Sequence, residues 1–365
     1  YGACGDPRKC EHHNAGHAAN LQLALAYSCN SYFLQVFRMA IDNPKYASAK
    51  GGYVKWKEYM NAFGFGRKLG VDLPSENKAN IPDTAQYNKD FGNPKYWNSC
   101  YMLTLGIGQD RMTATPLQLA NSMAFIANDG YYYTPHFVDS IESETQEEAA
   151  QLAPFRKKQK VTKIPKEYFD VIKEGMHDVT VIGTAAFIKV PGHDFCAKTG
   201  TAQNPHGKNH SLFVCFAPKE NPTIAVAVVV ENAGYGSTWA GPIAGLMMEK
   251  YLNDTLTTES KLKAENLSNV DLMPAAIKSW YVRNNKTEML TPIEYNNDEL
   301  ADVWDMEMLS EIAPAKAVMD TLKKIDTLPA APPSKPLPTN KVNKETAIDP
   351  LEKKKKATAK KDGKL

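Results

Sequence analysis

The chain has 365 residues, of which 43% are hydrophobic, so it can bury the core of one large domain or two ordinary ones. Its 43 lysines and arginines nearly balance 41 acidic residues, and the formal net charge is only +2. This balance argues against nucleic acid as a main partner, because phosphate backbones select strongly basic surfaces.

No run of about 18 apolar residues occurs, as a membrane-spanning helix would require. The first residues also lack the charged and then apolar pattern of a signal peptide. The sequence therefore predicts no segment that inserts into a membrane.

The N-terminal third predicts mainly helices. Residues 1–20 are rich in Gly, His and Cys and predict an irregular lead-in. Apolar spacing over residues 18–39 predicts two helical segments, with the polar triplet Ser28-Cys29-Asn30 at their joint. Residues 55–63 predict an amphipathic helix, whereas residues 83–97, rich in Tyr, Asn and Pro, predict a long surface loop.

The middle of the chain mixes helical and polar stretches. Thr115 and Pro116 predict a helix start, as N-cap and first helical residue. An extended segment is predicted at 131–133, and the polar residues 145–163 predict a mobile insert. Residues 166–179 predict another helix, which precedes a structural turn at Gly183-Thr184-Ala185.

Strand patterns follow that turn. Strands are predicted around Lys198, over residues 211–217 and over residues 223–231, and a packing helix is predicted at 240–252. This order predicts an α+β fold, in which helices flank an antiparallel sheet.

The strand around Lys198 carries residues suited to binding an anion. Lys198 offers an ammonium and Thr199 and Thr201 offer hydroxyls for a carboxylate, while Gly200 lets the backbone approach a ligand. The amide of Thr201 can stabilise a developing oxyanion. Lys, Thr and Gly meet by chance in many chains, so this motif alone predicts little.

A second motif makes the pattern specific. Ser28-x-Asn30 followed by Lys198-Thr199-Gly200 resembles the motif order of the penicillin-binding transpeptidases. Over about the first 250 residues the chain is similar to the class B, elongation-type members of that family. The similarity includes two further stretches, LGIGQDRMTATPLQLANSMAFIANDG at 105–130 and GTAAFIKV at 183–190.

The resemblance implies a β-lactamase/transpeptidase-like fold whose N-terminal part is missing from this chain. The family's nucleophile motif, Ser-x-x-Lys, should precede Ser28, yet residues 1–27 contain no serine. Formal matches starting at Ser75 and Ser260 lie in polar, charged contexts and are predicted to be decoys.

The resemblance further implies a peptidoglycan D,D-transpeptidase that works through an acyl-serine intermediate during cell-wall elongation. Ser28 would relay a proton towards the leaving group, and Asn30 would hold the substrate amide and the lysine of the upstream Ser-x-x-Lys motif. Thr199 and Thr201 would bind the terminal carboxylate beside Lys198, and the Thr201 amide would complete the oxyanion hole. Expected ligands are stem peptides and β-lactam antibiotics.

Its implied setting is the periplasmic face of the bacterial inner membrane, with an anchor upstream of Tyr1. A membrane glycosyltransferase and elongation-complex proteins are the implied partners. Two alternatives stay open: a D,D-carboxypeptidase or β-lactamase of the same fold, and a non-catalytic ligand-sensing or scaffold domain.

The cysteines and histidines near the N-terminus are consistent with a metal site. Cys4, Cys10, His17 and Cys29 could supply thiolates and an imidazole to a structural zinc. His17 and Cys29 match positions at which some elongation-type relatives hold a metal, but those relatives use carboxylates where this chain has cysteines. A Cys4–Cys10 disulfide and free thiols are the alternatives.

Catalysis itself is expected to need no cofactor. Three other cysteines are predicted to be small buried residues: Cys100, Cys196 and Cys215.

Three segments are expected in total. Residues 1–254 form the transpeptidase portion, and residues 255–327 form a helical C-terminal extension. Residues 328–365, Pro-rich and then basic, are predicted to be disordered because they cannot bury enough apolar surface.

Overall fold

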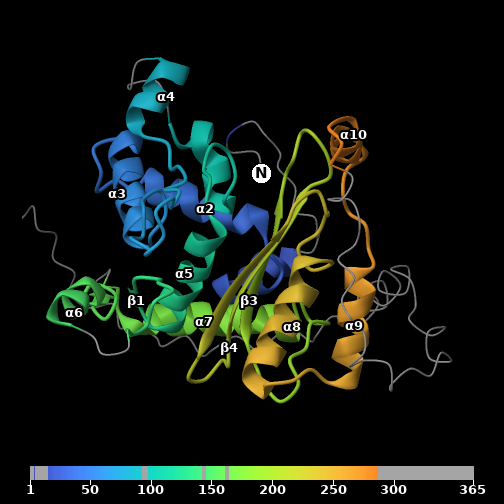
Figure 1. Cartoon of the computed structure of the whole chain (residues 1–365). Helices are drawn as coiled ribbons and strands as arrows, with labels where there is room; N and C mark the ends of the chain where they lie inside the picture. The colour runs from blue at the N-terminus through green and yellow to red at the C-terminus, as the bar shows by residue number, and fades with distance from the viewer. Residues whose placement is uncertain (1–3, 5–14, 93–97, 142–144, 161–163, 287–365) are drawn as a thin grey trace, which may run out of the picture. The chain divides into compact units, whose positions relative to one another are not determined.

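The computed structural model of this chain describes residues 4, 15–92, 98–141, 145–160 and 164–286. These residues fall within one compact unit, Tyr1–Pro292. None of the helices within the described ranges is long and apolar enough to span a bilayer. The elements in chain order (Figure 1) are η2 (Ala15–Ala18), α1 (Leu21–Ala26), α2 (Asn30–Ile41), α3 (Ala49–Ala62), α4 (Thr84–Phe91), η3 (Ser99–Ile107), α5 (Pro116–Ala127), β1 (Tyr131–Tyr133), α6 (Gln146–Leu152), β2 (Lys158–Lys160), α7 (Lys166–Val181), β3 (Cys196–Ala202), β4 (His210–Ala217), β5 (Ile224–Val230), α8 (Ala240–Asn253), α9 (Thr258–Ser268) and α10 (Ala275–Arg283).

Three strands form the main described sheet, in the antiparallel order β3-β4-β5. The register pairs Lys198 with Val214 and Gly200 with Leu212. Within the described residues β3 therefore lies at one edge of the sheet and leaves the outer side of its backbone without a strand partner.

Alternate residues of these strands enter two different cores. Ala197 and Phe213 pack against Ala244 of α8 in the first core. Cys196 and Phe216 lie in the second, with Met123 of α5 and Met176 of α7. Figure 1 shows α8 along one side of the sheet, and the contacts place α5 and α7 against its strands as well. The expected antiparallel sheet flanked by helices is confirmed.

A separate core lies between α2, α3, α4 and η3. Its fully buried members include Leu34, Tyr53, Tyr87 and Met102. The rings of Tyr53 and Tyr87 meet edge to face, with centroids 5.2 Å apart. Burying an aromatic or aliphatic side chain of this size contributes about 1.5–3 kcal/mol, so this core holds α4 in place.

One prediction of irregular structure is wrong, and a second polar segment contains regular elements. Residues 84–91, expected in a surface loop, form α4, because Asp83 caps the helix and the i,i+4 pair Tyr87 and Phe91 gives it an apolar face. The expected mobile insert at 145–163 contains α6, which begins with a Thr145–Glu148 capping box, and β2, which pairs with β1; its mobility stays a prediction.

Several predicted boundaries are confirmed. The two helices joined at Ser28-Cys29-Asn30 are α1 and α2. Thr115 caps α5 in a capping box with Gln118, and Pro116 is its first residue. The part of the predicted helical extension beyond residue 286 and the predicted tail lie outside the described residues, and the segment boundaries at 254 and 327 stay predictions.

Helix α9 is attached to α8 through a buried carboxylate. Glu249 is 1% exposed and accepts hydrogen bonds from the Thr257 amide and the Ser260 hydroxyl. Ser260 therefore serves the first turn of α9, and its interpretation as a decoy for the nucleophile stays a prediction. Ser75, the other decoy, lies in an exposed turn.

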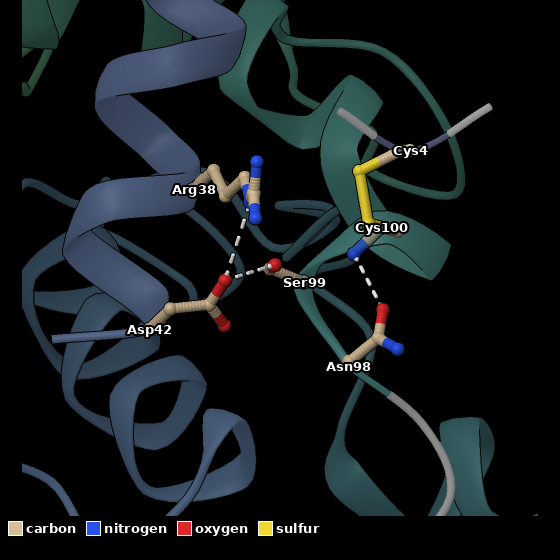
Figure 2. Close-up of a disulfide and its surroundings, with 6 residues drawn as sticks. All are labelled: Cys4, Arg38, Asp42, Asn98, Ser99 and Cys100. Atoms are coloured by element: carbon tan, nitrogen blue, oxygen red, sulfur yellow. Dashed lines mark hydrogen bonds and ion pairs between the residues drawn. A yellow bond between two sulfur atoms is a disulfide. The ribbon is translucent and has the colours of Figure 1, made fainter. Parts of the chain in front are cut away.

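A disulfide joins Cys4 to Cys100, 96 residues apart in sequence (Figure 2). Beside it, the Ser99 hydroxyl donates to the Asp42 carboxylate at 2.6 Å, and Asp42 also pairs with Arg38. The prediction that Cys100 is only a small buried residue is wrong, as is the alternative Cys4–Cys10 disulfide. Pairing depends on spatial proximity, which cysteine spacing alone does not reveal.

Removing this disulfide should destabilise the chain. We expect Cys100→Ala to lower the free energy of unfolding by about 2–4 kcal/mol, because the cross-link restricts the unfolded chain over a long loop. Denaturant unfolding with and without a reducing agent measures the effect. The reductant should destabilise the parent and leave Cys100→Ala unchanged, and a parent that ignores the reductant would contradict the assignment.

Candidate functional site

Ser28 occupies a strained turn between two helices. Its φ is +53°, in the left-handed region that residues other than Gly, Asn and Asp seldom adopt. The Cys29 amide donates to the Ala24 carbonyl at 2.8 Å, which closes the end of α1 just before α2 begins. The turn therefore holds the Ser28 side chain in a defined position, and such strain is typical of functional sites.

Lys198 of β3 reaches this turn. Its Nζ donates to Ser28 Oγ at 2.6 Å and to the carbonyl of Thr199 at 3.0 Å. Among the described residues, no carboxylate pairs with the Lys198 amine. Removal of water from around that amine lowers the pKa of Lys198 from 10.5 to about 8. The side chain is partly exposed, so an anionic ligand can compensate its charge.

The outer edge of β3 faces the same region. The Thr199 carbonyl accepts from Lys198, and the Thr201 carbonyl accepts from Gln109 Nε2 at 3.4 Å. In an antiparallel pair, a residue directs its N–H and C=O to the same side, and successive residues alternate. The Thr201 amide therefore points away from β4, as an oxyanion-hole donor must.

A turn that follows α7 contacts the side chain of Thr199. Its hydroxyl lies 2.8 Å from the hydroxyl of Thr184. The Thr184 amide in turn donates to the carbonyl of Ala26, the last residue of α1, at 3.0 Å. The turn thus contacts both the strand and the helix that precedes Ser28.

The loop that leads into α8 packs closely on the backbone of Gly200. A Cβ at Gly236 would lie 2.4 Å from the Gly200 carbonyl oxygen and 2.2 Å from that of Leu212. Only glycine fits at 236, and the segment leading into α8 therefore crosses the sheet directly at the motif. Ser211 fixes this segment, since its hydroxyl donates to the Tyr235 carbonyl and accepts from the Ala240 amide.

The structure brings most of the predicted catalytic residues together. Ser28 and Lys198 are in direct contact, with Thr199, Gly200 and Thr201 alongside on β3. Asn30 is the first residue of α2, and in the described part of the chain no hydrogen bond joins its side chain to Ser28 or Lys198.

Sequence reasoning missed two residues. Gln109 and Thr184 both lie in stretches that resemble the family, but neither was assigned a role in the site. Their side chains contact Thr201 and Thr199 only because the chain folds back on β3.

The predicted zinc ligands do not fit a metal site. Cys4 is bonded to Cys100 and cannot act as a thiolate, and Cys10 lies outside the described residues. His17 stacks on the ring of Tyr27 at 3.8 Å, while Cys29 is buried at the start of α2. Within the described ranges, no group of three or more His, Cys, Asp or Glu residues is arranged to hold an ion. The prediction that Cys4 is a zinc ligand is wrong.

The remaining cysteines are structural. Cys196 and Cys215 are fully buried, as predicted, and burial raises the pKa of both thiols. A thiol with a raised pKa is a poor nucleophile at neutral pH.

The Lys198 amine should titrate near pH 8. We expect NMR of isotope-labelled lysine side chains to show one resonance with a midpoint about 2.5 pH units below that of an ordinary lysine, as its desolvation requires. Lys198→Met should remove this resonance. Lys55 is a matched control, because it pairs with Glu58 at 2.7 Å, which raises its pKa. A Lys198 midpoint at or above 10.5 would contradict the assignment.

The same shift has a consequence for stability. The folded chain releases the Lys198 proton at a lower pH than the unfolded chain, so the unfolded state binds more protons between about pH 8 and 10.5. The contribution of Lys198 to stability should therefore rise across this window. Denaturant unfolding of the parent and Lys198→Met at pH 7 and pH 10 measures it. Parallel pH profiles of the two proteins would refute it.

Comparison with known proteins identifies the family. Residues 5–249 match the model of the penicillin binding protein transpeptidase domain. The peptidoglycan D,D-transpeptidase MrdA of Haemophilus influenzae is 32% identical over 269 residues, which are 67% of this chain and 38% of that protein. MrdA of Escherichia coli K12 is also 32% identical, with 68% of this chain and 39% of that protein covered. The chain thus spans about two fifths of the length of these relatives.

Solved structures agree with the sequence comparison. Pseudomonas aeruginosa PBP2, in complex with WCK 5153, is 30% identical with a TM-score of 0.54, over 65% of this chain and 49% of that one. Helicobacter pylori PBP2, in a complex with MreC, is 26% identical with a TM-score of 0.51, over 65% of this chain and 41% of that one. With its Ser28-x-Asn30 turn against the Lys198-Thr199-Gly200 strand, this chain belongs to the penicillin-binding protein transpeptidase family.

Proposed function

We propose that this chain is the C-terminal portion of a serine-type peptidoglycan D,D-transpeptidase, which cross-links stem peptides during cell-wall elongation. The observation that carries the proposal is the 2.6 Å contact between Lys198 Nζ and Ser28 Oγ, beside the edge of β3 that has no strand partner in the described part of the chain. The curated relatives are D,D-transpeptidases, which supports the same assignment.

The substrate enters with its terminal carboxylate toward the β3 motif. A stem peptide ends in D-alanine, and its carboxylate is attracted by the Lys198 ammonium, which has no carboxylate partner among the described residues. Hydroxyls of Thr199 and Thr201 donate to the same group. The outward Thr201 amide donates to the carbonyl oxygen of the penultimate D-alanine, where negative charge develops.

We place the nucleophilic serine and its lysine partner N-terminal to Tyr1, in a Ser-x-x-Lys motif. The serine Oγ attacks the penultimate carbonyl and its lysine accepts the proton. The peptide C–N bond breaks, and the leaving D-alanine amine takes up a proton. Because Ser28 Oγ accepts a hydrogen bond from Lys198, the hydrogen of the Ser28 hydroxyl is free to point at that amine.

The acyl-enzyme is then resolved by an amine of a second stem peptide. That nitrogen forms the new peptide bond, the ester C–O bond breaks, and the serine recovers its proton. None of these steps requires a cofactor or the zinc ion considered from the sequence. A β-lactam would acylate the same serine.

Two alternatives would use the same site: a hydrolase of the same fold and a non-catalytic sensing domain. In a D,D-carboxypeptidase or a β-lactamase, water resolves the acyl-enzyme in place of the second amine, and a sensing domain would bind ligands without turnover. Products distinguish them: a transpeptidase yields cross-linked dimers, whereas a carboxypeptidase releases D-alanine without them.

The cellular setting is also a proposal. We infer a position on the periplasmic face of the bacterial inner membrane, with an anchor N-terminal to Tyr1. The solved complex of Helicobacter pylori PBP2 with MreC supports an elongation-complex partner. A membrane glycosyltransferase, which supplies the glycan strands, is the second inferred partner.

Labelling with a fluorescent penicillin tests the proposal. The longer natural protein that contains this chain should form one stoichiometric adduct, mapped to a Ser-x-x-Lys serine N-terminal to Tyr1. Residues 1–365 expressed alone should form none. An adduct on Ser75 or Ser260, or no adduct on the longer protein, would contradict the proposed catalysis.

The role of Lys198 can be tested in the same assay. Lys198→Ala should slow acylation by about 10²–10³-fold, as expected when a preorganised charge at the reacting centre is lost. Lys55→Ala, which removes an exposed lysine of α3, should react as the parent does. Comparable rates for Lys198→Ala and Lys55→Ala would exclude Lys198 from the machinery.

A further inference from the structure

The turn at Gly183-Thr184-Ala185 joins two parts of the site that are far apart in sequence. The backbone amide of Thr184 donates to the Ala26 carbonyl at 3.0 Å, two residues before Ser28. Its side-chain hydroxyl lies 2.8 Å from that of Thr199, next to Lys198. One residue therefore bonds to the helix that ends at the Ser28 turn and to the strand that carries the lysine.

The position of this turn is tightly determined. A Cβ at Gly183 would lie 2.1 Å from the Ala26 carbonyl oxygen, so the turn packs directly on the end of α1. The Gly183 amide donates to Asp178 and the Ala185 amide to Val179, which fixes the turn to the end of α7. Ala185 is fully buried. The Thr184 side chain thus starts from a backbone that has little freedom.

Ligand binding determines which of the two hydroxyls donates and which accepts in this contact. A hydroxyl has one hydrogen, so Thr199 can donate to a ligand carboxylate only if it accepts in its contact with Thr184. Thr184 must then be the donor. We propose that Thr184 is a positioning residue, whose hydroxyl orients that of Thr199 toward the carboxylate of the substrate or inhibitor, an inference that rests on the proposed function.

Without the Thr184 hydroxyl, Thr199 loses the donor that directs its own hydrogen outward. Thr184→Val keeps the β-branched shape and the backbone amide, and it removes only the hydroxyl. Recognition of a carboxylate should then weaken, whereas recognition of a neutral ligand should not change. Thr184→Ser keeps the hydroxyl and should behave as the parent does.

The test compares two probes on the longer natural protein: a penicillin with its free carboxylate and the methyl ester of the same penicillin. The second-order acylation rate with the acid should fall about tenfold in Thr184→Val, the effect of one charge-assisted hydrogen bond of about 1.4 kcal/mol. The rate with the ester should stay within about twofold. Thr184→Ser should restore the rate with the acid, and Thr258→Val, which alters an exposed threonine of α9, should leave both rates unchanged.

A double-mutant cycle adds a second measurement. In a Thr199→Val background, Thr184→Val should cause no further loss with the acid, because the group that it orients is gone. A loss of stability caused by Thr184→Val would slow acylation in both backgrounds. It therefore cannot mimic a loss that occurs only where Thr199 is present.

The outcomes separate the possible explanations. Equal losses with acid and ester would show that Thr184 only supports the fold and would overturn the proposal, as would unchanged rates with both probes. If the parent reacts with neither probe, the proposed transpeptidase function fails, and this inference fails with it.

Discussion

The hydrogen bond between Lys198 and Ser28 is the contact on which the candidate site depends. Its two residues are 170 positions apart, so neither can be placed without the intervening fold. Helix α7 makes the connection, because it packs against both α1 and β3. A Cβ at Gly175 of α7 would lie 2.6 Å from Leu25 Cδ1, which shows how closely α1 approaches. The end of α1, and with it Ser28, is therefore positioned relative to the strand through α7.

The environment of Lys198 differs from that of other partly buried lysines. Lys173 pairs with Asp129 at 2.6 Å, and Lys219 pairs with Glu174, which raises the pKa of Lys219. Lys198 instead meets a hydroxyl and a carbonyl, and desolvation lowers its pKa. Keeping a charge in such a place costs stability unless a ligand compensates it. A lysine of this kind is typical of a binding or catalytic site.

Close backbone contacts give the site its rigidity. Gly183 packs on the Ala26 carbonyl, and Gly236 packs on Gly200, where any larger residue would force the segments apart. The first contact holds a loop against the end of α1, beside Ser28, and the second holds a loop across β3 and β4 at the strand motif. Thr184, in the first of these loops, and Gln109 then reach Thr199 and Thr201 through their side chains. Strand β3 thereby gains a contact from Gln109 on the side that has no strand partner among the described residues.

Local chemistry along the chain determined much of what could be predicted. Period-2 and period-3.6 patterns indicated the main strands and most helices, and Thr115-Pro116 marked the start of α5, because these signals depend on near neighbours. The order of the Ser28-x-Asn30 and Lys198-Thr199-Gly200 motifs indicated the family. Helix α4 was missed although Asp83 and the spacing of Tyr87 and Phe91 are local helix signals; the burial of Tyr87 against Tyr53, which local composition does not contain, adds the tertiary contact that holds it.

Only the tertiary structure decided the features that depend on residues distant in sequence. Cys4 pairs with Cys100 rather than with Cys10 or a metal, because folding brings η3 to the N-terminal segment. Gln109 and Thr184 join the site because their loops fold onto β3. The lowered pKa of Lys198 likewise requires the packed surroundings that remove water from its amine. The sequence by itself thus determined the residue types and the order of the motifs, whereas their distances, partners and charge states arose from packing.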